Sequence, residues 1–236
     1  MNYAIVTFGC QMNLHESEKI AGILRSVGYE KEVAPEEADI IVFNTCCIRE
    51  NAENHAFGNI GALKKLKRQK KGLIIAVGGC MAQEPGKAQV LKEKFPFIDI
   101  IFGTHNIFEL ASLIERKKSE KRVISLYEDR LETEDGAPSC RTSYPNAWVN
   151  ITYGCNNFCT YCIVPYVRGR ERSRRPEAVR AELEELVRSF LPEAPLWVAV
   201  NERDQPVGFM LLSGQHMDAL FIDPDVRGCG VGRMLV

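Results

Sequence analysis

Three cysteines lie close together in the second half of the chain: Cys155, Cys159 and Cys162. Their spacing, C-x3-C-x2-C, falls on a loop that directly follows a strand expected over residues 147–153. Thiolates at this spacing can bind three irons of a 4Fe-4S cluster and leave the fourth iron open to another ligand. A structural zinc site normally takes four protein ligands, and no obvious fourth ligand lies nearby. The sequence therefore predicts a metal centre on this loop.

A second group of cysteines is spread over the first third of the chain. Cys10, Cys46 and Cys80 are separated by 36 and 34 residues, about one strand–helix unit each. Each follows an apolar run expected to be a parallel strand, and the carboxyl ends of such strands share one edge of a sheet. Three thiolates could converge there on an iron–sulfur cluster with one open iron, or on a zinc site with an open position. The alternative is three small buried residues at strand ends, because free cysteine is often buried.

Basic residues form two short windows. One window follows the cysteine loop and consists of Arg168, Arg170, Arg172, Arg174 and Arg175. Guanidinium groups bind phosphates in pairs of hydrogen bonds and stack on bases, so these arginines are candidates for contact with RNA. The other window, Lys64–Lys71, has six bases in eight positions and is either a solvated helix face or a phosphate contact.

Strand and helix patterns alternate over the first 130 residues. Apolar runs predict strands over residues 3–8, 39–44, 73–77 and 98–102. Helical spacing predicts helices over residues 16–27, 51–70, 85–95 and 106–118. Such alternation implies a parallel sheet covered by helices on both faces. We therefore expect an α/β domain over residues 1–130 that positions the first three cysteines.

The pattern changes twice after this domain. Residues 131–146 are acidic, contain Gly and Pro, and are expected to form a linker. Residues 147–187 read as a strand, the cysteine loop and an amphipathic helix. Residues 188–236 read as antiparallel strands over 196–200, 207–212 and 218–222, the first two joined by a turn.

Composition narrows the class of protein further. Hydrophobic residues make up 45% of the 236 residues and charged residues 26%, with a net charge of −1, as in an ordinary globular chain. The longest apolar run is far short of the ~20 residues that span a bilayer. The first residues also lack the basic segment and apolar core of a secretory signal. Nine cysteines in such a chain favour metal ligands or catalytic groups over disulfides, and we expect a cytoplasmic protein with no membrane partner.

The cysteine loop resembles the radical S-adenosylmethionine (SAM) signature. Four further segments accompany it: TFGCQMN at 7–13, NTCCIREN at 44–51, GCMAQ at 79–83 and IVPYVRGR at 163–170. Together they resemble the radical SAM methylthiotransferases, over residues 1–187. The Gln11-Met12-Asn13 variant is similar to the branch that acts on tRNA rather than on a ribosomal protein.

The resemblance implies two 4Fe-4S clusters and SAM as cofactors, with tRNA and an external electron donor as partners. A cluster on Cys155, Cys159 and Cys162 would reduce SAM and release a 5′-deoxyadenosyl radical. This radical would take hydrogen from C2 of an N6-isopentenyl-modified adenosine next to the tRNA anticodon. A cluster on Cys10, Cys46 and Cys80 would carry or donate the sulfur, and a second SAM would supply the methyl group. No residue of the chain is predicted to be catalytic by itself, since the cofactors carry the chemistry.

The last residues resemble a different family. DPDVRGCGVG at 223–232 resembles the acetyl-CoA motif of the GNAT N-acetyltransferases, with Arg227, Gly230 and Gly232 at its key positions. Glycine amides at a helix N-terminus bind pyrophosphate well, although a turn that merely opens a helix is the alternative. We expect residues 147–187 to be the truncated start of a radical SAM (β/α) partial barrel, followed by a truncated, β-rich acetyltransferase fragment over 188–236.

Two unrelated families in one chain suggest an artificial junction near residues 182–188. We expect a tRNA methylthiotransferase by family, with this chain incomplete and inactive, because an unfinished barrel cannot enclose a radical. One alternative is a non-catalytic iron–sulfur or zinc-binding module. The other is a CoA-dependent N-acetyltransferase activity confined to the tail. The sequence predicts no particular oligomeric state.

Overall fold

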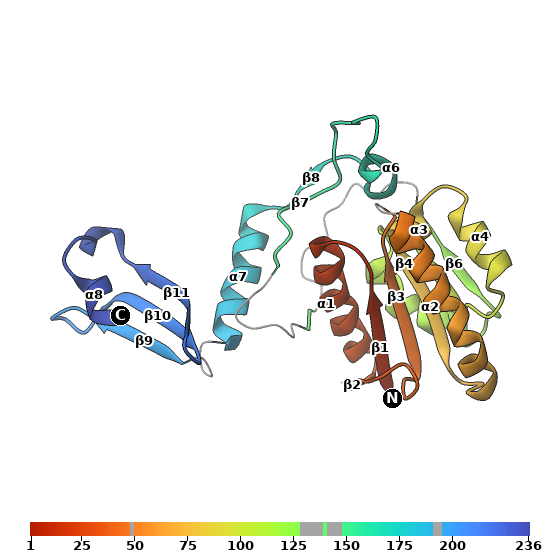
Figure 1. The fold of residues 1–236 in the computed structure, drawn as a ribbon, viewed down its shortest axis with the longest axis horizontal. Coiled ribbons are helices and arrows are strands. Elements are labelled where there is room, and N and C mark those ends of the chain that lie inside the picture. Colours follow the sequence, from red (N-terminus) through yellow and green to blue (C-terminus); the bar gives the residue numbers. More distant parts are fainter. Residues whose placement is uncertain (48–49, 128–138, 141–147, 191–194) are drawn as a thin grey trace. The chain divides into compact units, whose positions relative to one another are not determined.

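The structure is a computed structural model that describes residues 1–47, 50–127, 139–140, 148–190 and 195–236 (Figure 1). The described residues fall into two compact units. Unit 1 contains the described residues up to Val179, and unit 2 begins at Arg180. Residues 1–130 and 147–187, expected to form separate domains, thus lie largely in one unit.

Unit 1 is built on a six-stranded parallel sheet with the order β2-β1-β3-β4-β5-β6. The strands are β1 (Asn2–Thr7), β2 (Lys31–Glu32), β3 (Ile40–Thr45), β4 (Ile74–Gly79), β5 (Ile100–Phe102) and β6 (Val123–Ser125). In the central strand, Ile41 lies opposite Ala4 of β1 and Ile75 of β4. The predicted α/β class with a parallel sheet is confirmed.

Helices cover both faces of this sheet (Figure 1). They are α1 (Gln11–Ser26), α2 (Glu50–Gln69), α3 (Cys80–Gln83), α4 (Lys87–Lys94) and α5 (Leu110–Lys117), the last preceded by a 3-10 turn over Ile107–Glu109.

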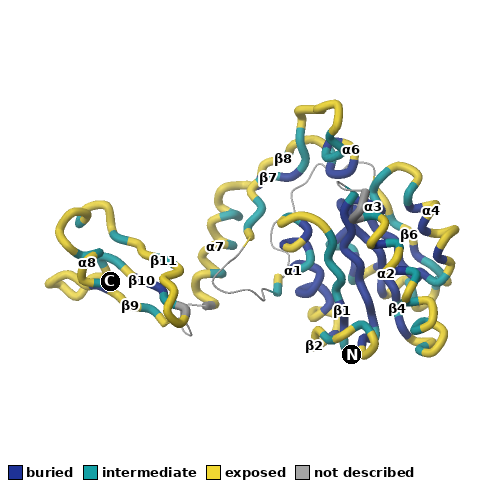
Figure 2. The backbone as a smooth tube through the Cα atoms, viewed as in Figure 1, coloured by how far each residue is buried: buried dark blue, intermediate teal, exposed yellow. Residues whose placement is uncertain are grey.

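Alternate side chains of a strand point to opposite faces of its sheet, so β3 contributes to two cores. Ile40 and Val42 lie in the core that also contains residues of α1 and α5. Ile41 and Phe43 lie in the core that contains residues of α2 and α4. Every residue of β3 is buried, as Figure 2 shows for the middle of the sheet.

Several element boundaries differ from those expected. Helix α1 begins at Gln11, directly after Cys10, and not near residue 16. Its first turns carry buried polar residues such as Asn13, which hide the apolar spacing of a helix. The helix expected over residues 85–95 is shorter and follows the single turn α3. Strands β2 and β6 have two and three residues, too few to give a periodic signal.

The rest of unit 1 surrounds the cysteine loop. Strand β7 (Thr152–Tyr153) pairs antiparallel with β8 (Arg172–Ser173), and helix α6 (Val164–Arg168) lies between them in sequence. Within the described residues 148–153, only the two of β7 are in a strand, fewer than expected. Helix α7 (Pro176–Phe190) begins in unit 1 and continues into unit 2.

Unit 2 contains a three-stranded antiparallel sheet with the order β11-β10-β9. Its elements are β9 (Leu196–Val200), β10 (Pro206–Ser213), β11 (His216–Ile222) and the short helix α8 (Val231–Leu235). The three expected strands are therefore present. The Asn201 side chain closes the first turn by accepting hydrogen bonds from the N–H groups of Arg203 and Gln205.

Candidate metal centres

The structure places Cys10, Cys46 and Cys80 at the carboxyl edge of the parallel sheet. Cys10 lies between β1 and α1, Cys46 directly follows β3, and Cys80 is the first residue of α3 after β4. Strands β1 and β3 are neighbours, and the chain order reverses between them. Ligands of open α/β sheets bind in the crevice outside such a reversal point. Two of the three cysteines thus flank the position where this fold accepts a ligand.

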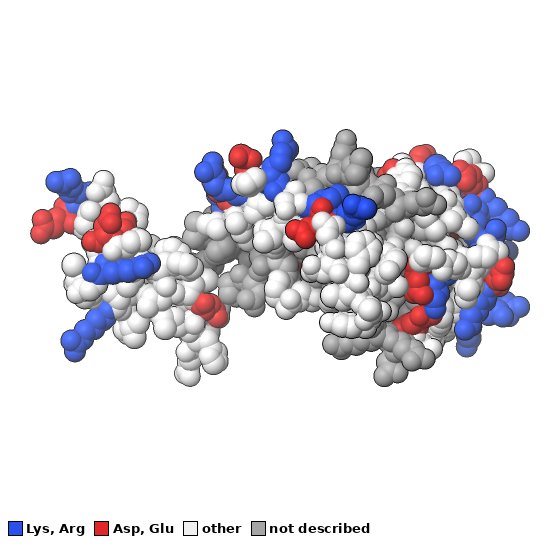
Figure 3. Space-filling view, turned by 90° about the horizontal axis from the view of Figure 1, so that it is seen from above, with Lys and Arg blue, Asp and Glu red and all other residues white. Residues whose placement is uncertain are grey.

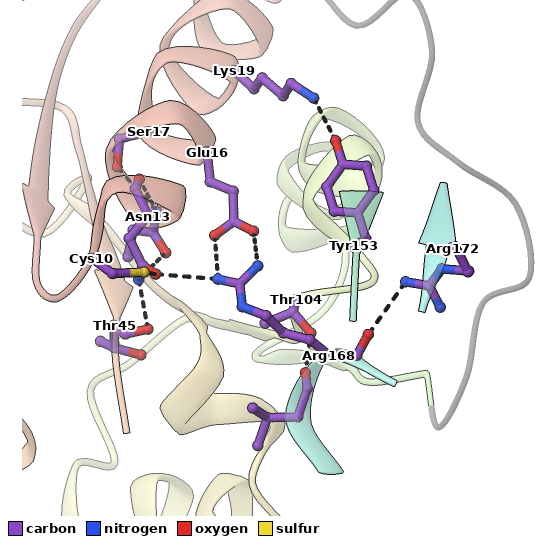
Figure 4. A network of polar contacts seen from close by, with 12 residues as sticks. Cys10, Asn13, Glu16, Ser17, Lys19, Thr45, Thr104, Tyr153, Arg168 and Arg172 are labelled. Carbon is purple, nitrogen blue, oxygen red and sulfur yellow. Dashed lines mark hydrogen bonds and ion pairs between the residues drawn. The ribbon is translucent and has the colours of Figure 1, made fainter. Parts of the chain in front are cut away.

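Polar contacts hold the loops of Cys10 and Cys46 together (Figure 4). The Asn13 amide donates to the carbonyl of Thr45 at 3.0 Å, and the Asn44 amide donates to the carbonyl of Asn13 at 2.8 Å. The Cys10 thiol donates to Asn13 Oδ1 at 3.4 Å. A Cβ at Gly9 would fall 2.8 Å from Cys46 Sγ, so the Cys46 side chain lies against the residue before Cys10.

Cys80 is surrounded by groups that favour its thiolate. A hydrogen bond from Cys47 lowers the pKa of the buried Cys80 thiol, burial opposes this, and the charge of Arg168 lowers the pKa further. The same hydrogen bond, together with burial, raises the pKa of Cys47, which remains a thiol. Thiolate is the form in which cysteine binds metal.

The donors at this edge suit an iron–sulfur cluster by their chemistry: three thiols from three loops, one of them held toward the thiolate. Cys46 and Cys80 are buried, whereas Cys10 is exposed. In the part of the chain that the structure describes, no three His, Cys, Asp or Glu side chains are close enough together to enclose a metal ion.

The second set of cysteines lies on the loop between β7 and α6. Its first residue is fixed by the backbone: the Cys155 N–H donates to the carbonyl of Gly169 at 3.2 Å. Gly154 has φ +74° and packs so closely that a Cβ would lie 2.1 Å from the carbonyl oxygen of Arg170. The Cys162 N–H donates to the carbonyl of Cys159 at 2.9 Å and closes the loop. Cys159 is exposed and the other two thiols are half-buried, which suits a ligand reached from solvent.

The arginines after this loop divide into two groups. Arg168 and Arg174 are only 6% and 5% exposed. Arg168 forms a bidentate pair with Glu16, at 2.5 and 3.1 Å, and Arg174 donates to the carbonyl of Asn150 at 2.9 Å. Since these two side chains are buried, the predicted contact with RNA falls to the more exposed arginines of the window. Arg170 and Arg175 are exposed, and Arg172 is half-buried.

The six bases of the window Lys64–Lys71, at the end of α2, also fall into two groups. Lys67 pairs with Asp99 at 2.5 Å and Lys70 with Asp39 at 3.3 Å, so two of the six bases attach the helix end to the sheet. The other four bases are exposed. Figure 3 shows Lys and Arg side chains at the surface on the right of the view, the side on which α2 and α4 lie in Figure 1.

The glycine motif of unit 2 lies on the turn before α8. Gly230 has φ +89° and directly precedes the helix, Gly232 is within it, and Arg227 is exposed and donates to the carbonyl of Ile222 at 3.4 Å. An acetyl-CoA site at these residues stays a prediction.

Two family models match the chain. One, described as "Uncharacterized protein family UPF0004", matches residues 2–103, and the radical SAM superfamily matches residues 149–194. The tRNA-2-methylthio-N(6)-dimethylallyladenosine synthase of Clostridium tetani is 51% identical over 195 residues, which are 82% of this chain. Over this part, the chain is similar to the radical SAM methylthiotransferases. The corresponding enzymes of Caldicellulosiruptor saccharolyticus and a Thermoanaerobacter strain are 51% and 49% identical.

The methylthiotransferase similarity covers only part of each relative. The matched region is 43% of the Clostridium tetani enzyme and 41% of the other two, so the chain spans about two-fifths of these relatives. A solved structure, the solution structure of apo-form YjaB from Escherichia coli, is 88% identical over 26% of this chain and 41% of its own, with a TM-score of 0.23. Among the described residues, we find no helix with the length and apolarity to cross a membrane.

Proposed function

We propose that this chain carries the two iron–sulfur sites of a tRNA methylthiotransferase. The first 4Fe-4S cluster would be held by Cys10, Cys46 and Cys80, and the second by Cys155, Cys159 and Cys162, where SAM would also bind. The observation that carries the proposal is the placement of both sets in one compact unit, one set at the carboxyl edge of the sheet and the other on a loop tied to it.

When bound, these groups would supply the electron for SAM cleavage and the sulfur for methylthiolation at C2 of an N6-isopentenyladenosine beside the tRNA anticodon. The residues of the chain would position the cysteine thiols for binding the clusters. Asn13 joins the loops of Cys10 and Cys46, and Cys47 donates a hydrogen bond to Cys80. The cofactors perform the chemistry, and the protein positions them.

The proposed partners are tRNA and an external electron donor, in the cytoplasm. The similarity to tRNA-2-methylthio-N(6)-dimethylallyladenosine synthases supports tRNA as the substrate.

The RNA contact is expected to involve Arg170 and Arg175, the exposed arginines after the cysteine loop. Replacing each by Gln removes one phosphate contact, which should weaken tRNA binding and reduce the slope of log K against log salt by about 0.7–0.9 per residue. The measurement is fluorescence anisotropy with an anticodon stem–loop over a series of salt concentrations. Arg203→Gln, at an exposed arginine of unit 2, is the matched control. Equal slopes for all three variants would count against this surface.

Iron counting tests the proposed function as a whole. The full chain, reconstituted without oxygen using iron and sulfide, should hold about eight irons and eight sulfides. Cys46→Ala and Cys159→Ala should each lower this to about half, because each removes a ligand from a different site. Cys229→Ala, at an exposed cysteine of unit 2, should leave the count unchanged. Uptake of zinc in place of iron, or one cluster shared by both sets, would contradict the proposal.

A further inference from the structure

Arg168 is a buried charged residue that reaches toward both sets of cysteines. It is the last residue of α6 and directly precedes Gly169, whose carbonyl accepts the N–H of Cys155. Its side chain points the other way, to Glu16 and Asn13 on α1 (Figure 4). Asn13 Oδ1 accepts from Arg168 Nη2 at 3.2 Å and from the Cys10 thiol at 3.4 Å. A single residue therefore connects the backbone of one set to the side chains around the other.

The Arg168–Glu16 pair is closed to solvent. Glu16 is 4% exposed and Arg168 is 6% exposed. Burial lowers the pKa of the guanidinium, but the charges of Glu16 and Cys80 outweigh burial and raise the pKa. A buried charge is costly unless it is paired with good geometry, and two parallel N–H to oxygen bonds supply that geometry. The side chain of Arg168 is thus held in one position.

Two other contacts hold the same segment to the sheet domain. Thr104 Oγ1 donates to the carbonyl of Val167 at 2.6 Å, and Lys19 Nζ donates to the Tyr153 hydroxyl at 3.0 Å. Neither of these two contacts involves a cysteine. Arg168 differs, because it donates to the same Asn13 oxygen as the Cys10 thiol, and its charge also lowers the pKa of Cys80.

We propose that Arg168 is a positioning residue that couples the two cysteine sites. Its ion pair with Glu16 holds the loop 155–162 at the carboxyl edge of the sheet. Its positive charge beside Cys10 and Cys80 raises the reduction potential of a cluster bound there. The second statement rests on the proposed function, whereas the first concerns the protein without metal.

The signs of the two charges make the proposal testable. Removing either partner breaks the ion pair and should loosen the loop in the same direction. The effects on potential are opposite, because a positive charge stabilises the more negative, reduced cluster and a negative charge destabilises it. Arg168→Gln should therefore shift the potential to more negative values and Glu16→Gln to more positive values. A purely structural role would shift both variants in the same direction.

The first measurement is hydrogen–deuterium exchange of the full chain without metal. Arg168→Gln and Glu16→Gln should both increase the exchange rate of peptides covering residues 152–170. Arg116→Gln breaks an exposed pair with Glu120 on α5 and should leave these peptides unchanged. If these peptides exchange in Arg168→Gln at the same rate as in the unsubstituted chain, the proposed coupling is overturned. Arg168→Lys keeps the charge and replaces the Gln variant in the test if that variant does not fold. Its exchange rate should lie between those of the parent chain and Arg168→Gln.

The second measurement is a redox titration followed by electron paramagnetic resonance. It uses the chain with Cys155, Cys159 and Cys162 replaced by Ala, so that only the first site can hold a cluster. Opposite shifts for Arg168→Gln and Glu16→Gln, with Arg168→Lys close to the parent, would support the proposal. Shifts in the same direction, or none, would overturn it. A chain that takes up no iron would contradict the proposed function and the statement on potential, while the exchange measurement still decides the coupling.

Discussion

Replacing Cys159 by Ala is expected to reduce formation of 5′-deoxyadenosine from SAM, a step that does not require methylthiolation of tRNA, to the background of a protein-free mixture. Cys159 is the exposed, central thiol of the loop 155–162. Its loss leaves two protein ligands where a SAM-binding cluster needs three, so the site for SAM is lost with the cluster. The measurement is product formation by the reconstituted full chain with dithionite and SAM, quantified by mass spectrometry.

Two further variants separate this effect from general damage. Cys46→Ala removes a ligand of the other site and should leave 5′-deoxyadenosine formation close to that of the parent chain. Cys229→Ala, in unit 2, should also leave it unchanged. If the parent chain binds two clusters and yet forms no 5′-deoxyadenosine, the chain is a non-catalytic iron–sulfur module. If Cys159→Ala keeps the activity, the loop is not the SAM site.

Gly79→Ala should destabilise unit 1 by about 3 kcal/mol. Gly79 ends β4 with φ +92° and ψ −167°, a conformation that is essentially restricted to glycine and costs other residues about 1–3 kcal/mol. A Cβ there would also lie 2.4 Å from the carbonyl oxygen of Thr45 on the neighbouring strand, and such overpacking costs about 1–3 kcal/mol. The measurement is urea unfolding of the full chain followed by circular dichroism. Since Gly79 directly precedes Cys80, iron uptake at the first site should fall as well.

Gly28→Ala is the matched control for this variant. Gly28 follows α1 with φ +94°, but nothing lies within 4 Å of a Cβ at this position. Its substitution adds only the backbone cost, about 1–2 kcal/mol. If both variants lose the same free energy of unfolding, the close contact with Thr45 does not destabilise Gly79→Ala, and the prediction for Gly79 is wrong.

The central strands could be predicted from the sequence because their signal is local. Residues 40–43 are apolar and β-branched or aromatic, and both faces of this strand are buried. The cysteines that follow these strands are therefore placed at the sheet edge by chain order and strand direction alone. Their position needs no knowledge of distant contacts.

The role of Arg168 could not be predicted in the same way. Its partner Glu16 lies 152 residues earlier in the chain, and an arginine in a basic window reads as a solvated or RNA-binding residue. The start of α1 could not be predicted either, because Asn13 and Glu16 are buried although they are polar, and polar residues give no apolar spacing. The one available signal is that Arg168 falls within the IVPYVRGR segment of the family resemblance.

The most direct test of two separate cluster sites is the Mössbauer spectrum of the full chain reconstituted with ⁵⁷Fe, recorded before and after addition of SAM. We predict that the iron is present as 4Fe-4S clusters and that SAM changes the signal of about one iron in eight, the open iron of the cluster on Cys155, Cys159 and Cys162. A spectrum of other iron species, or one that SAM leaves unchanged, would contradict the account.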